Sequence, residues 1–351
     1  MRVLAVTNMY PSEGFPGRGV FVQEQIKSLV NVGLSVRVLF IDRRREGPSA
    51  YYRMGARLTR EIAGFGPDLI HVMYGGVMAE QVLRWYHVRP ILVTFHGSDL
   101  LGENLSGWLR KLISRYGVWC SKSAAKAADG IIVVARHLLR ALPHALQPAK
   151  VRVVPCGIDL ERFRPLDPES CRRQLRWNDE SFHVLFASSN GDPVKRPGLA
   201  RAAVTETLAR GLPAELHFLS GVPNSEVPVW LSASDALLLT SLHEGSPTVV
   251  KEALACGLPI VSVDVGDVAE RIETVEGCYL AQPDAASLAD NLCLVRHRRS
   301  RLDCRPRLEA ISAFNIAQRL KTFYELVAAN QPTASFLSMG RQSLPGLQPS
   351  V

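Results

Sequence analysis

Short apolar runs alternate with longer segments of helical periodicity along almost the whole of this 351-residue chain. In the first half, the expected strands are residues 3–7, 35–41, 69–73, 91–95 and 130–134. In the second half, they are residues 183–187, 215–219, 236–240, 260–263 and 278–281. Parallel strands need a crossover between them, usually a helix such as the one expected over residues 20–32. The alternation therefore predicts an α/β fold with parallel sheets.

The length of the chain predicts two domains, because single cores seldom grow beyond about 250–300 residues. Residues 151–165, VRVVPCGIDLERFRP, read as a short strand followed by Pro, Gly and charge, which is typical of a domain joint. We expect one domain over residues 1–160, a second over residues 161–310 and a last helix over residues 311–330. Residues 331–351 are rich in Gln, Pro, Ser and Gly, and we expect them to be disordered.

The cysteines and the apolar runs exclude several classes of protein. There are seven cysteines, and no two of them form a C-x-x-C pair. An odd number without such a pair favours neither a disulfide framework nor a metal cage. No apolar run reaches the roughly 18 residues of a membrane span, and the N-terminus reads as a strand rather than a signal peptide. We therefore expect a protein of the reducing cytoplasm.

Basic residues gather in the first half. Residues 1–150 hold 20 Lys and Arg against 10 Asp and Glu, a net charge of +10, whereas the remainder carries −2 of the total +8. This asymmetry predicts that the first half faces something anionic. Nucleic acid is not favoured, because the sequence has neither zinc-ligand spacing nor an RNP-like aromatic strand.

Residues 107–128 predict a basic amphipathic helix. This segment contains no acid, and its cations are Arg110, Lys111, Arg115, Lys122 and Lys126. Its apolar residues include Trp108 and a helical stripe of Leu109, Leu112, Ile113 and Tyr116. Helices of this kind lie in anionic membrane interfaces, so Trp108, Arg110, Lys111 and Arg115 are predicted on the acceptor or membrane side. The alternative is that the stripe packs on the domain's own sheet and the cations are only solvated.

Residues 243–267, HEGSPTVVKEALACGLPIVSVDVGD, carry the most specific functional signal, because Glu244 and Glu252 stand eight positions apart. A helix that begins near Pro247 places Glu244 before its N-terminus and Glu252 within it, and eight residues span about 12 Å of helix axis. The free N–H groups at such a helix end bind phosphate. One acid on each side of the phosphate could then hold hydroxyl groups. A nucleotide-sugar has this arrangement, because its diphosphate lies between the ribose and the sugar.

An ordinary helix start is the alternative interpretation of the same residues. Ser246 would then be the cap and Pro247 the first helical residue, with Glu compensating the helix dipole. The residues beyond the helix favour the nucleotide interpretation. Residues 260–263 read as a buried strand, and Gly266 stands at its C-terminal end, where open α/β sheets bind ligands.

The block resembles the E-x7-E signature of the retaining GT-B glycosyltransferases of group 1, or family 4. The stretch EGSPTVVKEALACGLPIVSVDVGDV is similar to the subgroup of teichuronic-acid and exopolysaccharide glycosyltransferases. The resemblance covers residues 1–330, and the joint resembles the family's interdomain sequence, with Cys156 where Asn is usual. It implies two Rossmann-like domains that face a central cleft. The first would bind the acceptor and the second the nucleotide-sugar, and the last helix would cross back to the first domain.

The resemblance also implies roles for the residues of the block. Glu252 would hold the ribose hydroxyls, and Glu244 would contact the sugar hydroxyls as a catalytic residue. The diphosphate would face the amides of Gly245, Ser246, Thr248 and Val249. Pro247 has no N–H to offer. Transfer would retain the anomeric configuration, by front-face attack with assistance from the leaving group.

His96 follows an apolar strand, within the sequence TFHGSD of residues 94–99. A His at the C-terminal end of a strand donates hydrogen bonds to substrates and titrates near neutrality. A structural His that caps the strand is the alternative. Because T-x-H-G-x-D resembles the family's acceptor-side site, His96 is predicted as a catalytic residue near the reacting carbon, through its ring or its backbone carbonyl.

A glycine-rich loop precedes the first helix, with Gly14, Gly17 and Gly19. Glycine lets the backbone approach a diphosphate closely, although a flexible turn is the alternative. The family has a similar loop here, and Gly19 is the best match to its donor-binding glycine.

The loop of residues 187–197 contains Lys195 and Arg196. The family clamps the donor diphosphate with an Arg near position 189 and a Lys near position 195. This chain has Ser189 instead of the Arg, so Arg196, whose planar fork suits phosphate, is the candidate substitute. A solvated loop is the alternative interpretation of the two cations.

No metal and no cofactor are predicted for the transfer. Mg²⁺-dependent transferases present a D-x-D pair to the diphosphate, but two residues separate Asp264 from Asp267 and no D-x-D occurs in the sequence. Lys195, the amides of the block and the helix dipole would meet the charge of the leaving group. The nucleotide-sugar is a substrate rather than a cofactor, and the family favours UDP while leaving GDP open.

We therefore predict a retaining, metal-independent glycosyltransferase of bacterial cell-surface polysaccharide biosynthesis. It would be cytoplasmic and peripheral at the inner face of the membrane, with a saccharide or lipid-linked saccharide as acceptor. Two alternatives remain: a nucleotide-sugar epimerase of the same fold, and a non-catalytic binding protein derived from it, which Ser189 permits.

Overall fold

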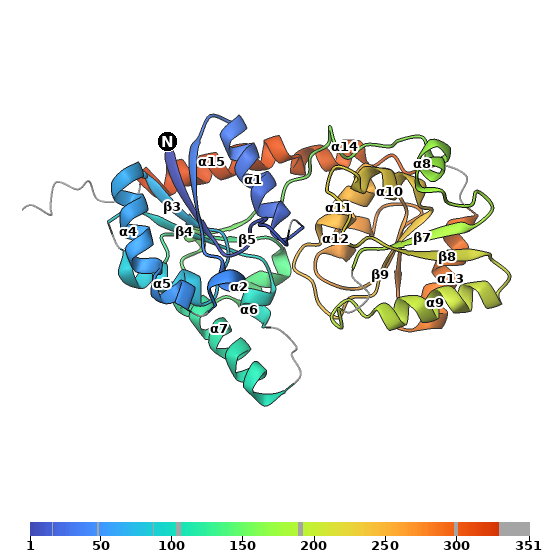
Figure 1. Cartoon of the computed structure of the whole chain (residues 1–351), viewed down its shortest axis with the longest axis horizontal. Helices are drawn as coiled ribbons and strands as arrows, with labels where there is room; N and C mark the ends of the chain where they lie inside the picture. The colour runs from blue at the N-terminus through green and yellow to red at the C-terminus, as the bar shows by residue number, and fades with distance from the viewer. Residues whose placement is uncertain are drawn as a thin grey trace, which may run out of the picture.

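The computed structural model describes residues 1–329, except residues 16, 48, 87, 103–106, 189–191 and 298–300. The predicted tail and Ser189 lie outside the described residues. Two parallel sheets, each covered by helices, form two domains (Figure 1). The predicted α/β class is confirmed, and each predicted strand differs from the observed strand by at most one residue at either end.

The first sheet has the strand order β2-β1-β3-β4-β5-β6. Its strands are β1 (Arg2–Thr7), β2 (Ser35–Phe40), β3 (Leu69–Val72), β4 (Ile91–Phe95), β5 (Gly130–Val133) and β6 (Val151–Val153). The helices of this half are α1 (Val20–Asn31), α2 (Arg43–Glu46), α3 (Ser49–Tyr52), α4 (Met54–Phe65), α5 (Val77–Trp85), α6 (Ser98–Leu101) and α7 (Trp108–Ala127), with the 3₁₀ turns η1 (Arg136–Ala141) and η2 (Pro148–Lys150). Strands β3, β4 and β5 are buried along their whole length, as expected for a parallel sheet covered on both faces.

The second sheet has the order β11-β10-β9-β7-β8. Its strands are β7 (Phe182–Phe186), β8 (Ala214–Phe218), β9 (Ala236–Leu239), β10 (Ile260–Val263) and β11 (Tyr279–Ala281). The helices around it are α8 (Pro168–Leu175), α9 (Pro197–Ala209), α10 (Val227–Ala233), α11 (Thr248–Ala255), α12 (Val268–Ile272), α13 (Ala285–Arg296) and α14 (Arg305–Leu308), followed by the 3₁₀ turn η3 (Glu309–Ile311). The boundary predicted near residue 160 falls between β6 and β7.

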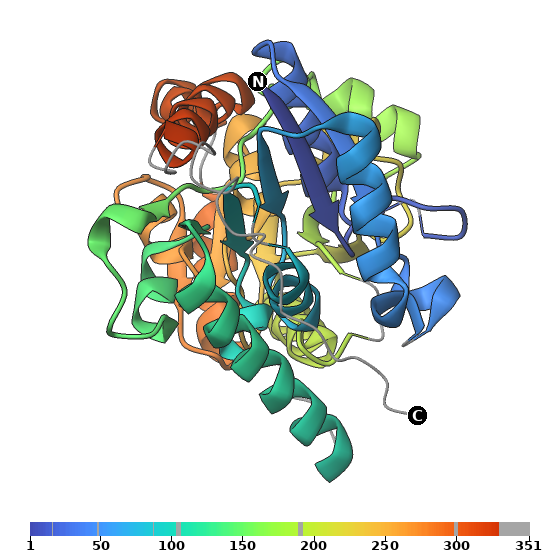
Figure 2. The same cartoon turned by 90° about the vertical axis from the view of Figure 1, so that its left-hand side faces the viewer.

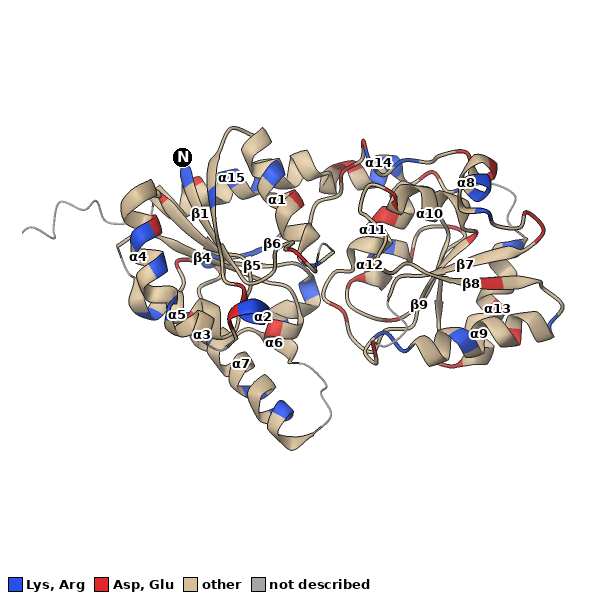
Figure 3. Cartoon of the chain, viewed as in Figure 1, with Lys and Arg blue, Asp and Glu red and all other residues tan. Residues whose placement is uncertain are grey.

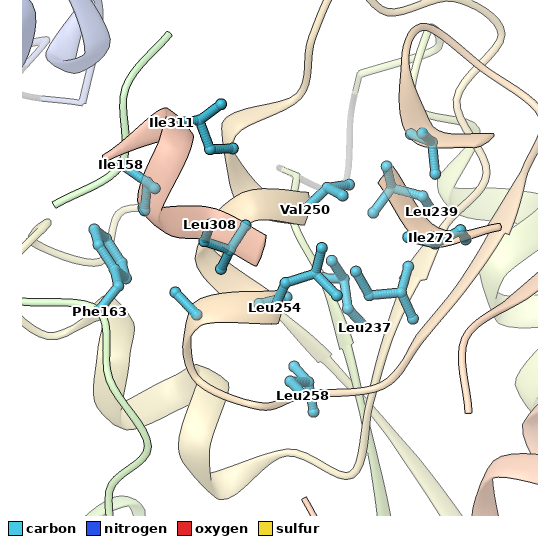
Figure 4. Packing of buried hydrophobic residues seen from close by; sticks show 14 of the residues in the cluster. Ile158, Phe163, Leu237, Leu239, Val250, Leu254, Leu258, Ile272, Leu308 and Ile311 are labelled. Atoms are coloured by element: carbon cyan, nitrogen blue, oxygen red, sulfur yellow. The ribbon is translucent and has the colours of Figure 1, made fainter. Parts of the chain in front are cut away.

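Helix α11 is held by the core of the second domain (Figure 4). Val250 and Leu254 are buried and belong to the same cluster as Leu237 and Leu239 of β9 and Leu308 of α14. Full burial of one such side chain contributes roughly 1.5–3 kcal/mol. Because residues four apart share a helix face, Thr248 and Glu252 lie together on another side of α11.

The last helix, α15 (Ala313–Ala329), packs against α1 in the first domain (Figures 1 and 2). The hydroxyl of Tyr324 lies 2.7 Å from Nδ1 of His71, a buried residue of β3. Lys321 Nζ donates to the carbonyl of Val32, just after α1, at 3.2 Å. A Cβ at Gly130 would lie 2.9 Å from Val327, so β5 needs glycine where this helix crosses it.

Helix α7 projects from the first domain with its N-terminal end away from the sheet (Figures 1 and 2). Its buried residues, Cys120, Ser121, Ala124 and Ala125, all lie in its C-terminal half. Trp108, Leu109, Leu112, Ile113 and Tyr116 are each more than half exposed. The sheet of the first domain therefore does not cover the apolar stripe. No helix in the described part of the chain has the length and apolar character needed to span a bilayer.

Candidate active site between the two domains

A cavity of about 1100 Å³ is lined by both domains. The first domain contributes α1 and Gly17, and the second contributes residues 219–224 together with Thr248 and Glu252 of α11. The joint at residues 157–163 and the beginning of α15 complete the wall. Ala187 and Leu219 directly follow β7 and β8, so the cavity lies at the C-terminal ends of these strands, where open α/β sheets bind ligands.

The N-terminus of α11 has no side-chain cap. The helix begins at Thr248, after Pro247 in an extended conformation. Ser246 does not cap it, because its hydroxyl donates to Asp267 Oδ2 at 2.8 Å and accepts from Lys251 Nζ at 3.1 Å. The assignment of Ser246 as cap and Pro247 as first helical residue is therefore wrong. The first N–H groups of α11 keep their capacity to bind an anion.

Glu252 lines the cavity, one helical turn after Thr248, and shares a hydrogen bond with the Thr248 side chain. Burial raises the pKa of Glu252 from 4.5 to about 7, against the opposing effects of Lys251, Thr248 and Arg162. The carboxyl thus changes charge near neutral pH. Its ionised form is an acceptor that suits the hydroxyls of a sugar.

Glu244 is separated from α11 by the turn of residues 245–247 and does not line the cavity. Its Oε1 accepts from Lys195 Nζ at 2.5 Å and from the hydroxyl of Ser241 at 2.8 Å. The structure therefore brings together Glu244 and Lys195, which the sequence predicts in separate loops. In this ion pair the cation and the acid neutralise each other.

Arg196 follows Lys195 in a left-handed conformation, with φ of 53°, and precedes α9. Its Nε donates to the backbone carbonyl of Thr240 at 2.5 Å. One edge of the guanidinium is thus used to hold the loop. The remaining N–H groups of Arg196 are the candidate donors to a phosphate.

His96 is held in a loop that touches the second domain. The buried carboxylate of Asp99 accepts from the backbone N–H groups of His96, Gly97 and Gly75. A Cβ on Gly245 would lie 1.7 Å from the carbonyl oxygen of His96, so only glycine allows this approach. The predicted acceptor side and the turn before α11 therefore meet through backbone atoms.

The ring of His96 is packed among other rings. It stacks on Tyr74 with 5.9 Å between centroids, and its centroid lies 4.8 Å from that of Phe21 at the start of α1. Burial lowers the pKa of His96 to about 4, so the imidazole is neutral at physiological pH. Its Nδ1 lies 4.0 Å from Sγ of Cys156 in the joint.

Two glycines of the glycine-rich loop have different roles. Gly17 lines the cavity, whereas Gly19 does not. Gly19 has φ of 68° at the start of α1, and a Cβ there would lie 2.3 Å from the backbone of Met9. Glycine at this position is thus required by packing against the backbone of the segment that follows β1.

Two charged residues of the site have no counterpart in the sequence predictions. Lys251 is buried, and its Nζ donates to the carbonyl of Cys156 at 3.0 Å, which connects α11 to the joint. Arg162 lines the cavity and pairs with Glu24 of α1 at 3.1 Å. No motif marks Lys251, and Arg162 stands inside the joint sequence, where its charge is the only signal.

The residues predicted on the membrane side all lie on the projecting part of α7. Trp108, Arg110, Lys111 and Arg115 are exposed. They are remote in sequence from the block of residues 243–267, and none of them lines the cavity.

Comparisons with known proteins agree with this architecture. The model of Glycosyltransferase Family 4 matches residues 13–162, and that of Glycosyl transferases group 1 matches residues 169–296. The chain is 26% identical to TuaC of Bacillus subtilis, a glycosyltransferase named for teichuronic acid biosynthesis, over 85% of this chain and 90% of that protein. It is 27% identical to the alpha-maltose-1-phosphate synthase of Mycolicibacterium smegmatis, over 81% and 85% of the two chains.

Solved structures share the same fold. Sucrose-phosphate synthase from Thermosynechococcus elongatus superposes with a TM-score of 0.69 at 18% identity, covering 94% of this chain and 97% of that one. HepE from Anabaena, in complex with UDP, superposes with a TM-score of 0.61 at 16% identity, covering 94% and 99%. The two domains and their arrangement are those of the GT-B class, which confirms the predicted fold. The chain belongs to the glycosyltransferases of group 1, family 4.

The raised pKa of Glu252 predicts a pH-dependent effect of its replacement on stability. The folded protein holds the proton of Glu252 up to about pH 7, whereas an ordinary glutamate releases it near 4.5. The partly buried carboxylate therefore lowers the free energy of unfolding increasingly as pH rises from about 4.5 to 7, by up to about 3 kcal/mol. Glu252→Gln should raise the melting temperature relative to wild type more at pH 8 than at pH 5.

Thermal unfolding at the two pH values measures this difference. Glu180→Gln, at an exposed position of the same domain, is the matched control and should show the same small shift at both. An effect of Glu252→Gln that does not change with pH would show that Glu252 carries no raised pKa.

Proposed function

We propose that this glycosyltransferase moves a sugar, with retention of configuration, from a nucleotide-sugar to a saccharide or lipid-linked saccharide. One observation carries the proposal: the uncapped start of α11 and the carboxyl of Glu252 meet at a cavity that both domains line. A helix end of this kind favours a diphosphate, and the second domain contributes an acid where the ribose would lie.

The donor is placed along α11. Glu252 would accept hydrogen bonds from the ribose hydroxyls, with the nucleobase toward residues 219–224 in the cavity wall. The N–H groups of Gly245, Ser246, Thr248 and Val249 would face the diphosphate. We propose UDP as the nucleotide, with GDP open, and the complex of HepE with UDP supports a nucleotide in this type of fold.

The ion pair between Lys195 and Glu244 suggests how the donor is received. The diphosphate would attract Lys195, whose Nζ now lies 2.5 Å from Glu244. Release of Lys195 frees Glu244 to accept from hydroxyls of the transferred sugar. The ammonium group of Lys195 and the N-terminus of α11 would then stabilise the negative charge of the leaving diphosphate. The proposed reaction therefore uses no divalent ion.

The acceptor would enter from the first domain. The loop of His96 faces the turn before α11, so an acceptor hydroxyl bound beside His96 would lie close to the sugar carbon. The neutral ring or the backbone carbonyl of His96 accepts a hydrogen bond there. Closure of the two domains excludes water, which would otherwise hydrolyse the donor.

Turnover of nucleotide-sugars tests this proposal. Wild type should release nucleotide slowly from its donor alone and faster with a saccharide acceptor, and the product should keep the anomeric configuration of the donor, as measured by NMR. Glu244→Ala should lower turnover by at least about 100-fold. It would remove the proposed contacts to the transferred sugar, and the loss of one polar contact to a transition state has an effect of this order. Glu169→Ala, an exposed acid on α8, is the control and should leave turnover unchanged.

The other outcomes of this experiment are distinct. Formation of an epimerised sugar from the donor alone would contradict the transferase assignment and indicate a nucleotide-sugar epimerase. Binding of nucleotide-sugar without turnover across the acceptor pool would favour a non-catalytic binding protein.

We also propose that α7 docks the protein on the anionic inner face of the cytoplasmic membrane, where it would contribute to bacterial cell-surface polysaccharide biosynthesis. Trp108 is 75% exposed and Ile113 is 59% exposed, and both project with the helix. Arg110, Lys111 and Arg115 stand beside them in the sequence and are exposed. Figure 3 shows basic residues on the projecting part of α7. Apolar residues inserted among acyl chains, with cations at the lipid phosphates, are the two contributions that such binding needs.

Co-sedimentation with vesicles tests the docking surface. Wild type should bind vesicles that contain anionic lipid, and Arg110→Ala with Lys111→Ala and Arg115→Ala should weaken binding roughly 100-fold, at about 1 kcal/mol per cation. Trp108→Ser with Ile113→Ser should also lose binding. Leu294→Ser, at an exposed apolar residue of α13, is the matched control and should bind as wild type. Equal binding of neutral and anionic vesicles, or full binding by both α7 variants, would contradict the proposal.

A further inference from the structure

A cluster of two histidines and a glutamate lies on the second sheet, outside the residues that line the cavity. His183 is on β7, and Glu215 and His217 are on β8. The register pairs His183 with Glu215 and Leu185 with His217. Because alternate residues of a strand share a face, the three side chains project from the same face of the sheet.

The three side chains bring their ligand atoms close together. Nδ1 of His183 lies 2.9 Å from Nε2 of His217, and this Nε2 lies 3.9 Å from Oε2 of Glu215. All three atoms lie within 4.8 Å of one another. One ion in their midst can therefore contact two imidazole nitrogens and one carboxylate oxygen.

The surroundings of His183 and Glu215 match those of metal ligands. The buried His183 donates through Nε2 to the carbonyl of Asn178 at 2.6 Å, so its Nδ1, which faces His217, is the nitrogen that carries the lone pair. The hydroxyl of Ser181 donates to the other oxygen of Glu215 at 2.6 Å. Metal-binding histidines almost always donate their second N–H to a carbonyl or carboxylate, and ligating carboxylates are hydrogen-bonded in turn.

We propose that His183, His217 and Glu215 bind a divalent first-row transition-metal ion. Imidazole nitrogen with one carboxylate suits Ni²⁺, Co²⁺, Cu²⁺ or Zn²⁺ rather than Mg²⁺. Two nitrogens about 2.0–2.1 Å from one ion lie about 2.9 Å apart when the angle between them is a right angle. The distance between the two ring nitrogens thus matches that of neighbouring ligands of an octahedral or square-planar ion. The carboxylate of Glu215, 3.9 Å from Nε2 of His217, would shift slightly to complete the set.

This metal would be separate from the sugar transfer. His217 stands two residues before Leu219, where the chain enters the cavity wall. The ion would clamp β8 to β7 immediately before residues 219–224. It would stiffen the base of this wall, and it would not contact the diphosphate at the N-terminus of α11. The inference therefore stands or falls independently of the proposed function.

The same contacts have a simpler explanation, which the experiment must separate. Nε2–H of His217 can donate to Nδ1 of His183, so that the two rings form a hydrogen bond without any ion. In that case the purified protein would bind no metal at this position, and the proposal would be overturned.

Trp177 provides an optical signal for the experiment. Its ring stacks on His217 with 3.6 Å between centroids and 10° between planes. Ni²⁺ or Co²⁺ bound to His217 should therefore quench part of the tryptophan fluorescence. Trp177→Phe should remove this quenching while calorimetry still detects binding of the ion.

Titration of the metal-free full chain with Ni²⁺, followed by calorimetry and fluorescence, tests the site. Wild type should bind one ion at saturation, and the absorption spectrum of the Co²⁺ form should lack the strong near-ultraviolet band of a cobalt–thiolate bond. His217→Gln should lose this binding. Glu215→Gln should weaken it by at least about 10-fold.

Matched controls make the result decisive. His297→Gln, at an exposed histidine after α13, should bind as wild type. If His217→Gln fails to fold, Glu215→Gln decides the question, because the Glu215 side chain is 47% exposed and its replacement leaves the core intact. Unchanged affinity in Glu215→Gln, or a cobalt spectrum dominated by thiolate, would overturn the assignment.

Discussion

The buried ammonium group of Lys251 determines how the site is built. A charge removed from water costs several kcal/mol unless polar partners surround it, so its partners must be in place in the folded protein. Those partners are the carbonyl of Cys156 in the joint and the hydroxyl of Ser246 in the turn before α11, with Asp267 accepting from Ser246. Lys251 thereby fixes the turn, the helix and the joint relative to one another. Because Ser246 is engaged in this network, it does not cap α11, and the helix end stays open to an anion.

The two domains then meet around that helix end. Gly245 touches the carbonyl of His96, while α15 returns from the second domain to pack on α1. The joint runs between them, and Ile158 exchanges backbone hydrogen bonds with Ile311 and Ala313 at the beginning of α15. These contacts place Glu252 in a cavity between the domains and leave Glu244 paired with Lys195 outside it. Binding of the proposed donor therefore requires that the ion pair between Lys195 and Glu244 opens, whereas the N-terminus of α11 and Glu252 are already in position.

Periodicity predicts most of the fold because parallel strands are buried on both faces and leave a continuous apolar run. Residues 91–95 and 260–263 match the observed strands without error. The sequence places the start of α11 one residue early, because a Ser-Pro pair before a helix is typical of a capped start. The hydroxyl of Ser246 instead bonds to Asp267, 21 positions further along the chain, and no local pattern indicates this contact. Lys251 escapes prediction because a lysine within a helix normally faces water.

Site residues are predictable where local motifs exist and escape prediction where only tertiary contact joins them. The loop of His96 and the block of residues 243–267 have recognisable local patterns. The cluster of His183, Glu215 and His217 has none, since 34 positions separate the histidines and only the register of β7 and β8 joins them. The apolar stripe on α7 is visible in the sequence, but its exposure depends on how far the helix projects beyond the sheet.

The central claim is that a nucleotide diphosphate binds at the open N-terminus of α11. Amide hydrogen exchange with residue resolution, measured by NMR with and without UDP, tests this claim most directly. The account predicts that UDP slows exchange at Thr248 and Val249 and shifts the signals of the Lys195 loop. UDP that binds without slowing exchange at these two amides, and instead protects another part of the chain, would contradict it.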